Sequence, residues 1–162
     1  MVNISVTDVR WWSRAACVSS FDLLRARFLV RLLIMNNHHH LIFIYGTLRR
    51  GGRAHYLMQD ADFQSKGLAS GRLVHVDQYP GLIPCDDEQV MGELYLVNDQ
   101  LLNELDRYEG CLESPPHYLR QETMVLLENG EKRSAMVYTF QLLESHHEEI
   151  KNGDWIQWIE SK

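Results

Sequence analysis

A short, almost entirely apolar segment, residues 41–45 (Leu-Ile-Phe-Ile-Tyr), places the strongest constraint on the fold of this chain. Apolar residues that do not alternate with polar ones over such a stretch are typical of a β-strand buried on both faces. Gly46 follows directly and ends the run. The rest of the chain must cover both faces of this strand, and 162 residues are enough to build one such core.

Four further segments are predicted as strands: residues 68–76, 90–97, 118–127 and 135–140. Gly71 allows a bulge or bend within the first of them. The Asn-Gly pair between the last two is a strong signal for a hairpin turn. Tyr79-Pro80-Gly81 is predicted as a turn that could also form the wall of a pocket.

One helix is well marked between residues 98 and 110. Asn98 or Asp99 can cap its start, and Gly110 occupies the position typical of a glycine just past a helix end. Its apolar face is Leu101, Leu102, Leu105 and Tyr108. A shorter helix is predicted around residues 142–151. The elements together predict an α+β fold dominated by a mixed or antiparallel sheet that can curl into a barrel.

Residues 1–40 differ from the remainder of the chain. They carry five Arg against two Asp, a net charge of +3, whereas residues 41–162 carry 11 basic against 20 acidic residues, a net charge of −9. We expect residues 1–40 to be an extension outside the domain formed by residues 41–162, with Met35 as a candidate true start. Its Arg-rich, amphipathic character also fits a targeting segment, and an integral helix is the third interpretation.

Charge and composition exclude several classes of protein. An acidic main body has no electrostatic reason to bind nucleic acid, so a small-molecule substrate is favoured. The apolar runs are shorter than the ~18 residues of a membrane span. The three cysteines lie far apart and form no CxxC pair, which favours a reducing cytoplasm and indicates neither a disulfide framework nor a zinc site. Adjacent histidines, as in residues 38–40, are poorly spaced for a metal, so no metal site is predicted.

Two places could carry chemistry. The turn after the first strand contains Gly46, which would let backbone N–H groups converge on an anion, although an ordinary turn has the same pattern. Gly46 and Gly51 have the spacing of a phosphate-binding loop, but Gly52-Arg53 replaces the required Lys-Ser/Thr.

The second place is the end of the helix, where Asp106 and Glu109 lie near the negative pole of the helix dipole. Such a position raises the pKa of a carboxyl group, as a general acid or base near neutrality requires. The alternative is a solvated carboxylate paired with a nearby base such as Arg107.

Several segments in order resemble the gamma-glutamylcyclotransferase family, in particular its gamma-glutamylamine cyclotransferase branch. They are residues 42–51, 79–81, 92–95, 105–110, 118–120 and 153–155. Together they span about residues 41–158 and leave residues 1–34 outside. The resemblance implies a small mixed α+β barrel that needs neither cofactor nor metal.

The resemblance also implies which residues act. It assigns the catalytic acid to Glu109 and substrate binding to the loop Tyr45, Gly46, Thr47 and Leu48, with Tyr79 and Tyr118 as further pocket residues. The implied reaction is an intramolecular aminolysis, in which the α-amino group of a gamma-glutamyl amine or peptide attacks its own γ-carbonyl and releases 5-oxoproline and an amine. Two alternatives are a non-catalytic domain that binds small metabolites in the same pocket and an interaction module that uses the basic N-terminal segment. The sequence assigns no oligomeric state.

Overall fold

A closed five-stranded barrel forms the centre of the fold in the computed structural model, which describes residues 38–141 and 147–162. Its strands are β1 (His39–Ile44), β2 (Asp62–Ser70), β5 (Gln89–Asn98), β6 (Tyr118–Leu127) and β7 (Lys132–Phe140), in the order β1-β5-β2-β6-β7. All neighbouring strands are antiparallel except β1 and β7, whose parallel pairing closes the barrel. The predicted α+β fold with a small mixed barrel is confirmed.

Strand β1 is buried on both of its faces, as its sequence predicts. Phe43 belongs to a core cluster built with the other barrel strands, whereas Ile42 and Ile44 belong to a second cluster that includes the helix α2 (Asp99–Tyr108). The short 3-10 helix η1 (His55–Met58) adds Met58 to the second cluster. Alternate side chains of β1 therefore belong to two different cores, and the loop after β1 begins between these two cores.

A second, three-stranded sheet carries β3 (Arg72–Val76), β4 (Tyr79–Ile83) and β8 (Glu148–Glu149) in the order β4-β3-β8. The prediction of one strand over residues 68–76 is therefore wrong. Gly71 lies between β2 and β3 with φ +153°, a value that side-chain-bearing residues rarely adopt, and its amide donates to the carbonyl of Glu88. The apolar pattern continues across Gly71, but the backbone turns there and enters another sheet.

The predicted turn at residues 79–81 is also wrong, since these residues begin β4. The turn lies just before them, where Asp77 has φ +51°. Pro80 is tolerated within a strand because β4 is at the edge of its sheet and needs no amide donor there. The strand places Tyr79 and Pro80 beside the loop that follows β1.

Helix α2 forms as predicted. The side chain of Asn98 accepts a hydrogen bond from the amide of Leu101, and Gly110 follows the helix end with φ +67°. Leu101, Leu102 and Leu105 are buried in the core, but the prediction that Tyr108 joins them is wrong, because its ring is exposed at the end of the helix. Among the described residues, no helix is long and apolar enough to span a membrane.

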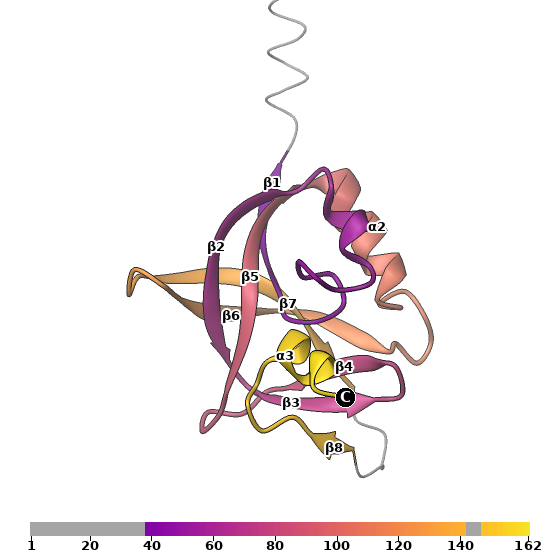
Figure 1. Cartoon of the computed structure of the whole chain (residues 1–162). Helices are drawn as coiled ribbons and strands as arrows, with labels where there is room; N and C mark the ends of the chain where they lie inside the picture. The colour runs from indigo at the N-terminus through magenta and orange to yellow at the C-terminus, as the bar shows by residue number, and fades with distance from the viewer. Residues whose placement is uncertain (1–37, 142–146) are drawn as a thin grey trace, which may run out of the picture. The chain divides into compact units, whose positions relative to one another are not determined.

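The second predicted helix is misplaced. Residues 148–149 form β8, which pairs with β3, and residues 142–146 lie outside the described part of the chain. The helix forms later instead, as α3 (Trp155–Glu160), where the Asp154 carboxylate caps the amides of Ile156 and Gln157. Trp155 is buried and joins the same core cluster as Phe43, and Figure 1 shows α3 lying against the small sheet.

We expect residues 41–162 to fold without the first 34 residues, because within the described part of the chain residues between 41 and 158 already form two core clusters. A chain that begins at Met35 should unfold cooperatively, with a melting temperature within a few degrees of the full chain. Circular dichroism during heating measures this. An unfolded or aggregated product would show that the N-terminal segment belongs to the core.

Candidate active site

One pocket, open to solvent, contains all of the residues to which the family resemblance assigned catalysis or substrate binding. It is lined by the end of β1 and the loop after it, the start of β4, the end of α2, the start of β6 and one residue of β7. The predicted residues in its lining are Tyr45, Gly46, Thr47, Leu48, Tyr79, Glu109 and Tyr118; Phe43, Ile44, Pro80 and Tyr138 complete it. Residues from five separate parts of the chain therefore meet in one concave site.

The loop after β1 folds back on itself and offers backbone groups to the pocket. The amide of Arg49 donates to the carbonyl of Gly46 at 3.0 Å, and the amide of Ala54 donates to Thr47 at 3.0 Å. No hydrogen bond within the described part of the chain is donated by the amides of Gly46, Thr47 or Leu48. These three consecutive N–H groups are suited to bind an anion.

Gly46 is required because Pro80 packs against it. A Cβ atom at this position would lie 2.5 Å from the Cγ of Pro80, well inside contact distance. The loop and β4 can approach so closely only without a side chain at residue 46. This contact makes the two strand ends adjacent walls of the pocket.

Two buried tyrosines attach β4 to the barrel at the pocket. The hydroxyl of Tyr45 donates to the carbonyl of Tyr138 at 2.9 Å and accepts the amide of Leu82 at 3.2 Å. The hydroxyl of Tyr118 donates to the carbonyl of Pro80 at 2.9 Å. Both phenol protons are therefore committed to the backbone, and burial raises the pKa of Tyr45 and Tyr118 well above the ordinary value.

Glu109 is the C-cap residue of α2 and, among the described residues, the only one with a carboxylate in the lining of the pocket. Within the described part of the chain, no hydrogen bond or ion pair joins its carboxyl group to another residue, so the alternative of a carboxylate paired with Arg107 is wrong. Burial raises the pKa of Glu109 to about 7. A carboxyl group with this pKa exchanges a proton readily near neutral pH.

Asp106, one helical turn earlier, has a different environment. It is buried, and its carboxylate accepts hydrogen bonds from Arg120 Nη1 at 2.5 Å and from the Tyr138 hydroxyl at 2.9 Å. Asp106 does not line the pocket. Its bonds instead hold β6 and β7 against α2, so its role is structural.

The comparisons with known proteins agree on one family. A family model described as gamma-glutamyl cyclotransferase, AIG2-like, matches residues 42–157, which is more than half of the chain. The chain belongs to the gamma-glutamyl cyclotransferase family. The resemblance noted in the sequence is thereby confirmed, and the chain is an enzyme of this class.

Individual members of the family share substantial identity with it. The gamma-glutamylaminecyclotransferase of Rattus norvegicus is 39% identical over 98 residues, which are 52% of this chain and 62% of that protein. The gamma-L-glutamyl-butirosin B gamma-glutamyl cyclotransferase of Niallia circulans is 32% identical over 72% of this chain and 76% of that protein. The crystal structure of an AIG2-like protein from Mus musculus superimposes with a TM-score of 0.56 at 32% identity, over 67% of this chain and 88% of that one.

The sequence did not single out all of the residues in this cyclotransferase pocket. Tyr138 was predicted only as part of a strand, and the parallel pairing of β1 with β7 brings that strand beside the pocket. Pro80 was expected in a turn. A period of two in β7 places Tyr138 on the same face as Met136 and Phe140, but only the closure of the barrel shows what that face contacts.

The raised pKa of Glu109 has a consequence for stability that can be measured. The carboxyl group of Glu109 has a pKa of about 7 in the folded chain and an ordinary pKa of 4.5 in the unfolded chain. Between these pH values the unfolded chain loses the proton more readily, so the folded state becomes less stable as the pH rises. We expect Glu109→Gln to raise the free energy of unfolding by about 1–3 kcal/mol more at pH 8 than at pH 5. Urea unfolding at the two pH values measures this difference.

Glu104→Gln provides the control, since Glu104 lies exposed on the same helix and its side chain accepts only a bond from Gln100. Its effect on stability should be the same at pH 5 and pH 8. An equal effect of Glu109→Gln at both pH values would contradict the raised pKa.

Proposed function

We propose that this cyclotransferase releases 5-oxoproline and a free amine from a gamma-glutamyl amine or peptide, with Glu109 as the group that transfers the proton. The observation that carries the proposal is the isolated carboxyl group of Glu109, with its pKa near 7, in a pocket that also offers three free backbone amides. The names of its relatives, which refer to gamma-glutamyl compounds, support the choice of substrate.

The reaction needs the substrate to fold back on itself. The α-amino nitrogen attacks the γ-carbonyl carbon, a new C–N bond closes the five-membered lactam, and the original amide C–N bond breaks. Because both reacting groups belong to one molecule, the enzyme accelerates the reaction by holding them in contact. In this proposal the amides of Gly46, Thr47 and Leu48 bind the α-carboxylate of the glutamyl group, and Tyr79 and Tyr118 enclose its chain.

Proton transfer is the second requirement, because an ammonium group cannot attack a carbonyl. The pKa of an α-amino group is about 7.7–8.0 in model peptides. The pKa of Glu109, about 7, lies about one unit below that of the amine, so transfer of the proton to its carboxylate is only slightly unfavourable. For an ordinary glutamate the difference between the two pKa values would be about three units. Glu109 then gives this proton to the departing nitrogen. The ring nitrogen carries a second proton after its attack, which Glu109 takes up as the lactam forms and passes to the released amine, so Glu109 ends the cycle as a carboxylate.

The tyrosines of the pocket are poorly suited to this role. Burial raises the pKa of Tyr45, Tyr118 and Tyr138, so none of them loses its proton near neutral pH. Each of the three hydroxyls also donates to a fixed acceptor. These three residues therefore shape the pocket, which favours Glu109 as the proton carrier.

Glu109→Gln tests the assignment directly. Glutamine keeps the shape of the side chain but cannot accept the proton, so kcat should fall at least about 10²-fold while 5-oxoproline still binds. Release of 5-oxoproline from a series of gamma-glutamyl amines and peptides is followed by mass spectrometry, and binding by thermal stabilisation. In the wild-type enzyme kcat should fall as the pH is lowered through about 7, where Glu109 becomes protonated.

Asp106→Asn is the matched comparison on the same helix. It disturbs the bonds to Arg120 and Tyr138 and should cost about 1–3 kcal/mol of stability, with a smaller loss of kcat than Glu109→Gln. Wild-type turnover in Glu109→Gln would refute the assignment. Binding of 5-oxoproline by a wild-type protein that turns over no gamma-glutamyl compound would favour a binding domain instead.

Gly46→Val tests the part played by the loop. The new side chain collides with Pro80 and displaces the loop from β4, so KM should rise by at least about tenfold while the domain stays folded. Steady-state kinetics measures KM, and circular dichroism verifies the fold.

Gly130→Val separates binding from stability. Gly130 has φ +82° in the hairpin turn between β6 and β7, so a valine strains the turn and lowers stability far from the pocket. Its KM should stay at the wild-type value. An unchanged KM in Gly46→Val would remove the loop from the site.

A further inference from the structure

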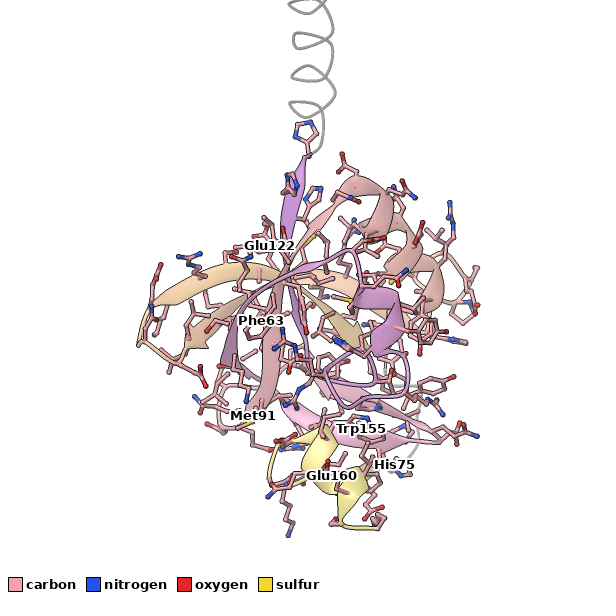
Figure 2. The ribbon with its side chains drawn as sticks, turned by 45° about the horizontal axis from the view of Figure 1, so that its top comes forward. Phe63, His75, Met91, Glu122, Trp155 and Glu160 are labelled. Carbon is pink, nitrogen blue, oxygen red and sulfur yellow. The ribbon has the colours of Figure 1, made fainter. Side chains whose placement is uncertain are left out.

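A second pocket adjoins the first and has a different lining. It is formed where the loop between β1 and η1 faces β3, the turn after β3, and α3, and its residues are Thr47, Arg53, His75, Gln78, Trp155, Trp158 and Ile159. Figure 2 shows His75 and Trp155 together at the end of the molecule where α3 lies. The proposed reaction assigns no part to this pocket.

The two pockets are adjacent. Thr47 lines both of them. The guanidinium of Arg53, in the second pocket, lies 4.4 Å from the centre of the ring of Tyr79, in the first.

The lining of the second pocket is aromatic. The rings of Trp158 and His75 are 4.5 Å apart, those of Trp155 and Trp158 are 5.2 Å apart and nearly parallel, and Ile159 adds an exposed aliphatic side chain. Such a surface binds a flat or branched apolar group by contact and by release of water.

The second pocket carries one guanidinium group, that of Arg53. Arg53 is exposed and donates to the neutral amide oxygen of Gln78 at 2.9 Å, and among the described residues no carboxylate contributes to the lining. Glu148 lies near His75, at 3.9 Å, but the Lys162 ammonium is closer to it, at 3.3 Å. A guanidinium without an acidic partner is suited to bind a carboxylate and disfavours a cation.

We propose that the second pocket holds the leaving amine, and that it selects an apolar amine bearing a carboxylate, as in a gamma-glutamyl amino acid with an aromatic side chain. This inference rests on the proposed function. When the amide C–N bond breaks, the leaving nitrogen takes the proton from Glu109. Arg53 then holds the carboxylate next to that nitrogen, and Trp158 and Ile159 contact the side chain.

Three substrates separate the two contributions. The leaving amine of gamma-glutamyl-phenylalanine carries both an aromatic ring and a carboxylate. That of gamma-glutamyl-phenethylamine carries only the ring, and that of gamma-glutamyl-glycine carries only the carboxylate. The variants are Arg53→Gln, Arg53→Lys and Trp158→Ala. Arg72→Gln is the matched control, because Arg72 is an exposed arginine that pairs with Glu88 and lines neither pocket.

The wild-type kcat/KM should be highest for gamma-glutamyl-phenylalanine. Arg53→Gln should lower kcat/KM about three- to tenfold for the two substrates with a carboxylate and leave the phenethylamine substrate unchanged. Arg53→Lys should restore part of the loss. Trp158→Ala should lower kcat/KM about tenfold for the two substrates with a ring and leave the glycine substrate unchanged. If Trp158→Ala lowers the melting temperature sharply, Ile159→Ser, a substitution on the exposed side of α3, is tested in its place.

Equal losses for all three substrates in Arg53→Gln would overturn the inference, because Arg53 would then act on the glutamyl group through Tyr79. Equal wild-type kcat/KM for the three substrates would overturn it as well. Release of 5-oxoproline in either case leaves the proposed function intact. Failure of the wild-type enzyme to release 5-oxoproline from these substrates and from gamma-glutamyl-methylamide would instead refute the proposed function, and this inference with it.

Discussion

The burial of β1 on both faces is the constraint on which the rest of the structure depends. Its alternate side chains enter two different cores, so a shift of the strand by one residue would move each side chain out of its own core and into the other. The parallel pairing with β7 and the antiparallel pairing with β5 fix it further. The loop that begins at Tyr45 therefore starts from a rigid point, as precise backbone recognition requires.

Two carboxylates on one helix show how the same fold gives similar groups opposite properties. Asp106 meets Arg120 and the hydroxyl of Tyr138, which stabilise its charge and make it part of the framework. Glu109 follows three residues later, beyond the last turn of α2, and meets no such donor, so burial raises its pKa. The bonds of Asp106 hold the end of the helix, and with it Glu109, against β6 and β7.

The sequence predicted those parts of the fold that local patterns determine. The capped helix, the hairpin around Gly130 and the buried first strand all carry strong local signals, and each forms as expected. The sequence-based predictions were wrong where contacts with distant parts of the chain determine the structure. At Gly71 one apolar run contributes to two different sheets, and at Pro80 a proline lies in an edge strand, where no amide donor is needed, and not in a turn. The grouping of the site residues came from the resemblance to the family, since no spacing rule joins residue 45 to residue 109. Arg53 and Trp158 carried no motif, and only the packing of α3 on β3 brings them together.

The hydroxyls of Tyr45 and Tyr118 have a consequence beyond the pocket. Strand β4 ends its sheet, and an uncovered edge of this kind is a template on which strands of other molecules can add. Here two of the backbone groups that such a strand would use, the carbonyl of Pro80 and the amide of Leu82, are occupied by tyrosine side chains. The residues that wall the pocket thus also block part of the free edge of β4 against the addition of another strand.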